Sequence, residues 1–145
     1  MSKVGTMIAI YPVTITGDAL MALKIRMKSR DWDFWTPLLL GDVTSDTIDL
    51  ELTRVQSLID NVADDPDCEA AEMSLSRYAM RRSAGTDRNL VGIPFFIMRG
   101  FRNRCILTSD DSPITTLSDL RGKRIGLSGW QDSGNTWTRA LLLEA

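Results

Sequence analysis

Residues 70–85 read AAEMSLSRYAMRRSAG, a short apolar run that leads directly into a helical pattern. The run from Ala70 to Met73 is apolar enough to form a buried strand. Ser74 is placed to cap a helix from Leu75 to Ser83, and Gly85 lies just past its end. This segment predicts a strand-to-helix unit of an α/β fold.

Strand and helix patterns alternate on both sides of this unit. Leu23, Ile25 and Met27 alternate with basic residues, which predicts a half-buried strand. The continuous apolar run 90–98 predicts a strand covered on both faces, bent or weakened at Pro94. The remaining predicted elements are strands at 48–52, 105–107 and 124–127, and helices at 38–40 after an Asp33 cap, 55–62, 115–124 with a Ser118 cap, and 134–145.

This alternation predicts the α/β class, with a mainly parallel sheet and flanking helices. Residues 1–22 precede the first clear strand pattern and are expected to form a poorly ordered N-terminal extension. The last helix has no C-terminal cap and no following strand. We therefore expect a chain that is truncated relative to the functional fold, or one that needs a partner.

Composition excludes several classes of protein. The 145 residues are 43% hydrophobic and 25% charged, which fits about one folded domain. A net charge of -2 argues against general binding of nucleic acid or anionic membranes, and no apolar run is long enough to span a membrane. The absence of histidine excludes histidine-dependent triads and histidine-ligated metals. Cys68 and Cys105 show no metal-binding spacing, so we expect free, buried thiols and no metal site.

The charges are unevenly distributed along the chain. Residues 31–72 carry one basic and twelve acidic residues, whereas residues 73–124 carry ten basic and four acidic ones. Solvated helix and loop faces explain this pattern. Alternatively, part of the basic stretch from Arg77 to Arg104 lines a site for a small carboxylate or phosphate.

Three predicted loops follow strands, where open α/β sheets bind their ligands. Asp31 and Asp33 flank Trp32 and are either acid/base candidates or turn residues. Ser74 and Ser76 begin a helix and either hold an anion or cap that helix. In the third loop, the amides from Ser133 to Thr136 can hold a carboxylate, or Asp132 or Ser133 caps the helix.

A fourth candidate is the segment from Arg99 to Arg104. On a regular extended segment, Arg102 and Arg104 share one face and Arg99 lies on the other. They either bind an anion or are displayed on the surface.

Five stretches in this order resemble 4,5-dihydroxyphthalate decarboxylase and its relatives: DWDFWTPLLLGDV, TIDLEL, EMSLSRYAM, IPFFIMRGFRNRCI and LSDLRGKRIGLSGWQ. The resemblance runs from about Leu23 to the last residue. It implies a type II periplasmic-binding-protein-like fold, in which two α/β lobes close over a ligand. Residues 23–98 would then form most of a first lobe, and residues 99–145 the crossover and the start of an incomplete second lobe.

The implied reaction is the non-oxidative loss of one carboxyl group from an aromatic dicarboxylate, which gives a dihydroxybenzoate without a cofactor. In our hypothesis the proton donor is Glu72 or Asp33, with a raised pKa. The expected ligand contacts are Trp32, Ser74, Ser76, Arg99, Phe101, Arg102, Trp130, Gln131, Ser133 and Asn135. Relatives often have histidine after the second arginine of the RGFRNR segment, where this chain has Asn103.

Two other functions remain open. A solute-binding protein of an ABC transporter would use the same cleft for an anionic solute without chemistry, and a truncated product would have no function of its own. The first residues show little of a secretory signal, so we expect a cytoplasmic protein, with a periplasmic location as the alternative. The expected partner is a small carboxylate ligand, and a homo-oligomer is a further option.

Overall fold

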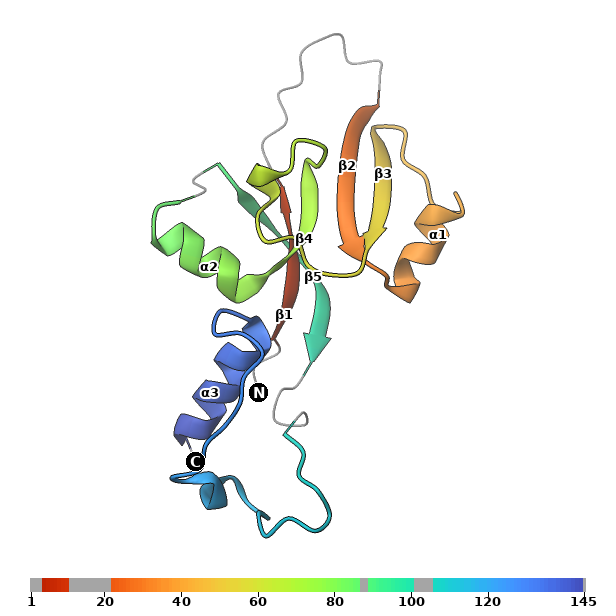
Figure 1. Cartoon of the computed structure of the whole chain (residues 1–145). Coiled ribbons are helices and arrows are strands. Elements are labelled where there is room, and N and C mark those ends of the chain that lie inside the picture. The colour runs from red at the N-terminus through yellow and green to blue at the C-terminus, as the bar shows by residue number, and fades with distance from the viewer. Residues whose placement is uncertain (1–3, 11–21, 87–88, 101–105, 145) are drawn as a thin grey trace.

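The computed structural model describes residues 4–10, 22–86, 89–100 and 106–144 (Figure 1). Their strands form one five-stranded sheet in the order β3-β2-β4-β1-β5. The strands are β1 (Val4–Ile10), β2 (Leu23–Arg30), β3 (Ile48–Val55), β4 (Ala70–Ser74) and β5 (Val91–Gly100). The helices are α1 (Thr36–Leu39), α2 (Leu75–Ser83) and α3 (Ser133–Glu144), with short 3-10 helices at Asp33–Trp35, Val62–Asp64 and Leu117–Leu120.

The sheet is mixed, which confirms the α/β class and corrects the expected mainly parallel arrangement. β2 pairs in parallel with β3 and β4, whereas β1 runs antiparallel to both β4 and β5. The parallel half brings the carboxyl ends of β2, β3 and β4 to the same edge of the sheet.

β1 lies between β4 and β5, so residues 4–10 are not the extension outside the fold that the sequence pattern suggested (Figure 1). Ile8 and Met7 are 5% exposed and Ala9 is fully buried. Met7, Ile8 and Ala9 are thus buried in a row, on both faces of the strand, without the alternation that marks a half-buried strand. Residues 1–3 and 11–21 lie outside the described part of the chain.

Two hydrophobic clusters stabilise the sheet. Ile8 and Ala70 belong to a cluster with Trp35, while the next residue of each strand, Ala9 and Ala71, belongs to a second cluster. Since consecutive strand residues point to opposite sides, the clusters occupy opposite faces of the sheet. Cys68 is buried as a free thiol in the second cluster, as expected, and Cys105 lies outside the described residues.

Several local predictions are confirmed. Residues 23, 25 and 27 alternate in burial with their neighbours on β2, and all of β4 is buried. Gly85 and Gly41 follow their helices with positive φ angles of 74° and 78°, a backbone conformation that glycine adopts without strain. At Pro94 the pairing of β1 with β5 shifts register, because proline cannot donate to the ladder.

Other local predictions are wrong. Val55 ends β3, and of the expected helix over 55–62 only a 3-10 turn beginning at Val62 forms. β5 is an edge strand with Phe95 half exposed, because it pairs only with β1 in the described sheet. Residues 106–107 and 124–127 form no strand.

Capping also differs from the prediction. Thr116 rather than Ser118 caps the turn Leu117–Leu120, through a reciprocal capping box with Asp119. Asp33 lies within the first turn of its 3-10 helix and is not its cap. None of the helices among the described residues is long and apolar enough to cross a membrane.

Candidate functional site

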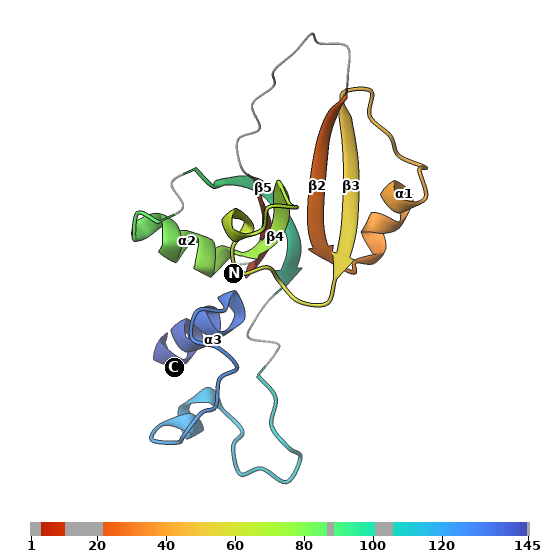
Figure 2. The same cartoon turned by 45° about the horizontal axis from the view of Figure 1, so that its top comes forward.

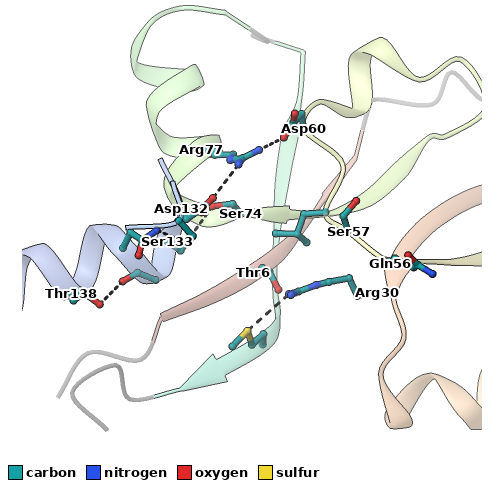
Figure 3. A pocket seen from close by; sticks show the side chains of 15 residues that line it. Thr6, Arg30, Gln56, Ser57, Asp60, Ser74, Arg77, Asp132, Ser133 and Thr138 are labelled. Carbon is teal, nitrogen blue, oxygen red and sulfur yellow. Dashed lines mark hydrogen bonds and ion pairs between the residues drawn. The ribbon is translucent and has the colours of Figure 1, made fainter. Parts of the chain in front are cut away.

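An open cleft of about 740 Å³ lies at the carboxyl ends of the parallel strands (Figure 3). The N-terminal ends of α2 and α3 meet there, and α3 lies below α2 in both overall views (Figures 1 and 2). This is where open α/β sheets commonly bind ligands. The lining residues come from β1, β2, β4, β5, the connection after β3, α2, and α3 with its preceding loop: Thr6, Arg30, Gln56, Ser57, Leu58, Asp60, Ser74, Arg77, Met98, Ser128, Asp132, Ser133, Gly134, Asn135 and Thr138.

Arg30 ends β2 and is the cation at one side of this cleft. Its Nη2 lies 2.6 Å from Oε1 of Glu72, and its Nε lies 3.2 Å from the same oxygen. The guanidinium is also held over the ring of Trp32, 4.9 Å from the ring centroid. Among the described residues, no hydrogen bond partner contacts Nη1.

Glu72 holds the guanidinium of Arg30 through this ion pair, and the Glu72 side chain is only 1% exposed. Besides the guanidinium, Oε1 of its carboxylate accepts a hydrogen bond from Thr6 Oγ1 at 2.6 Å. Oε2 accepts hydrogen bonds from the backbone N–H of Arg30 at 3.0 Å and from Ser29 Oγ and Trp32 Nε1 at 3.1 Å each. The carboxylate therefore connects β1, β2 and β4 and needs no further donor.

This network determines the ionisation of Glu72. Burial alone raises the pKa of a carboxyl group, but hydrogen bonds from Arg30, Thr6 and Trp32 outweigh burial and lower the pKa of Glu72 from 4.5 to about 2. The raised pKa expected for Glu72 is therefore wrong, since its donors stabilise the charged form. A carboxylate that stays ionised cannot serve as a general acid near neutral pH.

A cluster of serines joins the two helix ends. Ser74 Oγ lies 3.0 Å from Ser133 Oγ, and the backbone N–H of Ser76 donates to Ser133 Oγ at 3.1 Å. Ser76 Oγ donates to the carbonyl of Gln131. Ser74 makes no side-chain cap of α2, so its hydroxyl serves the contact with α3 instead. Helix N-termini favour negative charge, and here two of them border one cleft.

Arg77 occupies the other side of the cleft, in the first turn of α2 (Figure 3). Its Nη2 donates to Asp132 Oδ1 at 3.0 Å, and its Nη1 is ion-paired with Asp60. These contacts connect α2 with the loop before α3 and with the connection after β3.

The structure brings some of the predicted site residues together. Ser74, Ser133 and Asn135 line the cleft. Ser76 lies beside it through its contact with Ser133, and Gln131 through the contact of its carbonyl with Ser76. Asn135 Nδ2 donates to Gly129 O at 2.7 Å, which ties the loop before α3 to the helix.

Other predicted residues lie elsewhere. Asp33 and Arg99 are exposed and do not line the cleft. Trp32 does not line it either, and its ring packs against the guanidinium of Arg30. Trp130 is 69% exposed, with the guanidinium of Arg139 3.8 Å from its ring centroid. Phe101, Arg102 and Asn103 lie outside the described residues. Within the described ranges, no group of acidic or cysteine side chains could hold a metal ion.

Sequence reasoning missed Thr6, Arg30 and the pairing of Arg77. Arg30 directly precedes the DWD loop at the end of a predicted strand, a position that could have marked it. Thr6 could not be found, because nothing local to residues 4–10 indicates that they lie next to Glu72.

No family model matches the chain. The chain is 32% identical over 124 residues to the 4,5-dihydroxyphthalate decarboxylase of Comamonas testosteroni, covering 84% of this chain and 37% of that protein. It is 34% identical over 110 residues to the 4,5-dihydroxyphthalate decarboxylase of Pseudomonas putida, covering 74% of this chain and 42% of that protein. The chain thus spans about two fifths of the length of these curated relatives. On this sequence similarity, the chain belongs to the 4,5-dihydroxyphthalate decarboxylase family.

Proposed function

We propose that the cleft binds a carboxylate of an aromatic dicarboxylate, and that the chain serves the non-oxidative decarboxylation of 4,5-dihydroxyphthalate or a close analogue. The observation that carries this proposal is the guanidinium of Arg30. It lines the cleft, is fixed by Glu72 and Trp32, and keeps Nη1 unpaired among the described residues. A preorganised guanidinium of this kind suits a planar carboxylate.

The rest of the cleft supports an anionic ligand. The amino ends of α2 and α3 border the same space as Arg30, and the serine hydroxyls of their first turns supply further hydrogen-bonding groups. The volume of about 740 Å³ falls within the range of roughly 300–1,000 Å³ common for small-molecule sites. The partner class we propose is therefore a small carboxylate.

The chemistry requires that one carbon–carbon bond breaks and one carbon–hydrogen bond forms. In 4,5-dihydroxyphthalate, each carboxylated ring carbon lies para to a hydroxyl group, whose electrons stabilise the ring when that carbon is protonated. Loss of CO2 then returns the bond electrons to the ring and leaves 3,4-dihydroxybenzoate. The protein's task is to hold the retained carboxylate and orient the ring.

In this proposal Glu72 positions Arg30 and does not supply the proton, because its pKa is about 2. Water is the ultimate proton source. Arg99, Phe101 and Arg102 remain proposed ligand contacts, and Asp33 is the remaining carboxyl candidate for proton transfer if the loop carrying it approaches the ligand.

We further propose the type II periplasmic-binding-protein-like arrangement, with residues 23–98 in a first lobe and residues 99–145 contributing to a second. The contacts between Ser74 on β4 and Ser133 on α3 fit a ligand site between two such parts. The decarboxylase function goes with a cytoplasmic location.

A second candidate function is binding without chemistry, as in an exported solute-binding protein. The low pKa of Glu72 favours it, because the buried carboxyl group nearest to Arg30 cannot donate a proton. The same cleft would then bind an anionic solute.

Titration of the isotope-labelled chain with 4,5-dihydroxyphthalate, followed by NMR, tests the site. We expect the largest chemical-shift changes at the backbone amides of Arg30, residues 74–77 and residues 133–136. Arg54 is a matched reference, since it lies just before the last residue of the neighbouring strand β3 but pairs with exposed Asp31. Shifts scattered over β3 and α1, or no shifts at all, would refute the site.

Turnover separates the two functions. The chain is incubated with 4,5-dihydroxyphthalate, and release of CO2 and 3,4-dihydroxybenzoate is followed by mass spectrometry. Product formation supports the decarboxylase. Binding at the predicted amides without product rules out catalysis by this chain and supports the binding function.

A further inference from the structure

Three carboxylates surround two guanidinium groups at this cleft. Arg30 is paired with Glu72, and Arg77 is paired with both Asp60 and Asp132. The local charge of these five side chains is therefore negative, although two helix amino ends border the space. A ligand with two carboxylates gains little in such a site unless one protein carboxylate gives up its position.

The three carboxylates differ in how firmly they are held. Glu72 is 1% exposed and accepts hydrogen bonds from four residues. Asp132 is 37% exposed and directly precedes α3. Asp60 is 80% exposed, and among the described residues its side chain is paired with Arg77 alone. Asp60 is therefore the carboxylate that can leave at the lowest cost in lost contacts.

Arg77 can keep its place when Asp60 leaves. Its Nη2 remains bonded to Asp132 at 3.0 Å, and its side chain is largely covered, with 30% exposed. Its Nε is buried without a hydrogen bond to any described residue, so its present partners do not satisfy the whole guanidinium. Departure of Asp60 would free Nη1 toward the cleft, which Arg77 and Arg30 both line (Figure 3).

We propose that Asp60 occupies a second carboxylate subsite on Arg77, and that the second carboxylate of a dicarboxylate ligand displaces it. This inference rests on the proposed function, in which the first carboxylate binds at Arg30. Asp60 thereby acts as an internal competitor. A monocarboxylate binds at Arg30 and leaves the Asp60–Arg77 pair in place, whereas a dicarboxylate must exchange with Asp60.

The Asp60→Asn variant tests the exchange, because it removes the competing charge from an exposed side chain without disturbing the core. Dissociation constants for phthalate and benzoate are measured by titration calorimetry at one ionic strength. We expect the preference for phthalate over benzoate to rise about two- to fivefold, the equilibrium equivalent of losing one exposed ion pair. An equal gain for both ligands, or no gain, would overturn the inference.

Asp67→Asn is the matched control. Asp67 is also 80% exposed and also pairs with an arginine, Arg26, which keeps Glu69 as a second partner. Because Asp67 does not line the cleft, its variant should leave the preference unchanged. Arg77→Lys should reduce the preference for phthalate, since an ammonium cannot replace the planar fork.

The outcomes distinguish this inference from the function on which it rests. If neither phthalate nor benzoate binds the wild-type chain or the Asp60→Asn variant, the proposed function fails. If both ligands bind and Asp60→Asn leaves their ratio unchanged, only the exchange at Arg77 fails. If Arg77→Lys does not fold, the phthalate-to-benzoate preference of the Asp60→Asn variant still tests whether a ligand carboxylate displaces Asp60.

Discussion

Glu72 and Arg30 form an ion pair in which the glutamate side chain is 1% exposed, while the arginine side chain is 29% exposed and lines the cleft. Their closest atoms, Oε1 and Nη2, are 2.6 Å apart. The pair thus joins the buried sheet to the candidate ligand site. Because the buried carboxylate holds the partly exposed arginine, the orientation of the arginine is set when the sheet folds.

Replacing Glu72 with glutamine should destabilise the protein. The variant leaves Arg30 without its counter-charge and disturbs the hydrogen bonds from Thr6 and Ser29. Removing one partner of a buried pair costs about 3–5 kcal/mol, and the partial exposure of Arg30 reduces our expectation to about 2–3 kcal/mol. Urea unfolding followed by circular dichroism measures this loss. Glu51→Gln is the control, since Glu51 pairs with Lys24 at an exposed site. Equal unfolding midpoints for both variants would contradict the structural role of Glu72.

Stability should decrease at acid pH because of the same carboxylate. Its pKa is about 2 in the folded protein against an ordinary value of 4.5, so the unfolded chain binds the proton more readily between these values. The contribution is complete above pH 4.5 and is lost as the pH falls toward 2. At about 1.4 kcal/mol per pKa unit it amounts to about 3 kcal/mol.

Glu69, whose pKa is also lowered to about 2 by Arg26, contributes to the same loss of folding stability at acid pH. The informative measurement is therefore the difference in unfolding free energy between wild type and Glu72→Gln, taken from pH 7 to pH 2.5. This difference should shrink as the pH falls. A constant difference across the range would show that Glu72 does not titrate as described.

Gly92→Ala should destabilise the contact between β1, β5 and α2. A Cβ at Gly92 would overlap Met7 Cε and lie 3.0 Å from Tyr78 Cζ. The backbone N–H of Gly92 also donates to the Tyr78 hydroxyl at 3.0 Å, which leaves little room for adjustment. Overpacking of this kind costs about 1–3 kcal/mol, which thermal unfolding detects.

Gly126→Ala is the matched control for Gly92→Ala, because a Cβ at Gly126 meets no atom within 4 Å. Its melting temperature should stay close to that of the wild type. If Gly92→Ala were equally harmless, β1 would not pack against β5 as described.

Ser133→Ala should loosen α3 from α2. Ser133 is 5% exposed, and its hydroxyl contacts Ser74 Oγ and the N–H of Ser76. Losing a buried hydroxyl with such contacts costs about 1–3 kcal/mol. Hydrogen exchange by mass spectrometry should show faster exchange over residues 133–144, with less change in β4.

The control for Ser133→Ala is Ser83→Ala at the exposed end of α2. This substitution should leave exchange in α3 at the wild-type rate. Unchanged exchange in Ser133→Ala would mean that the serine cluster does not hold the helix.

Local patterns predicted much of the first part of the fold. The alternation around Ile25, the buried run of β4 and the glycine after α2 each depend on a few neighbouring residues, and each is confirmed. The pattern over 55–62 failed because apolar residues at i, i+3, i+4 and i+7 also arise where a strand end is followed by a packed connection. Of these, Val62 is buried at the start of a 3-10 turn and not on an α-helix.

The candidate site was predictable only where it lies on helix ends. Ser74 directly precedes α2 and Ser133 begins α3, positions that sequence marks by itself, and the two serines meet in the structure. That the two meet is a tertiary result, since 59 residues separate them along the chain.

By itself, the sequence determined the α/β class, the helix starts near Ser74 and Ser133, and the resemblance to the decarboxylase family. Only the tertiary structure decided that residues 4–10 form an inner strand, that Glu72 is an ionised support for Arg30, and that Arg77 lies between Asp60 and Asp132. The reason is physical. Strand period and helix capping are set within a few residues, whereas the charge state of a buried carboxyl group depends on donors that only the folded chain brings to it.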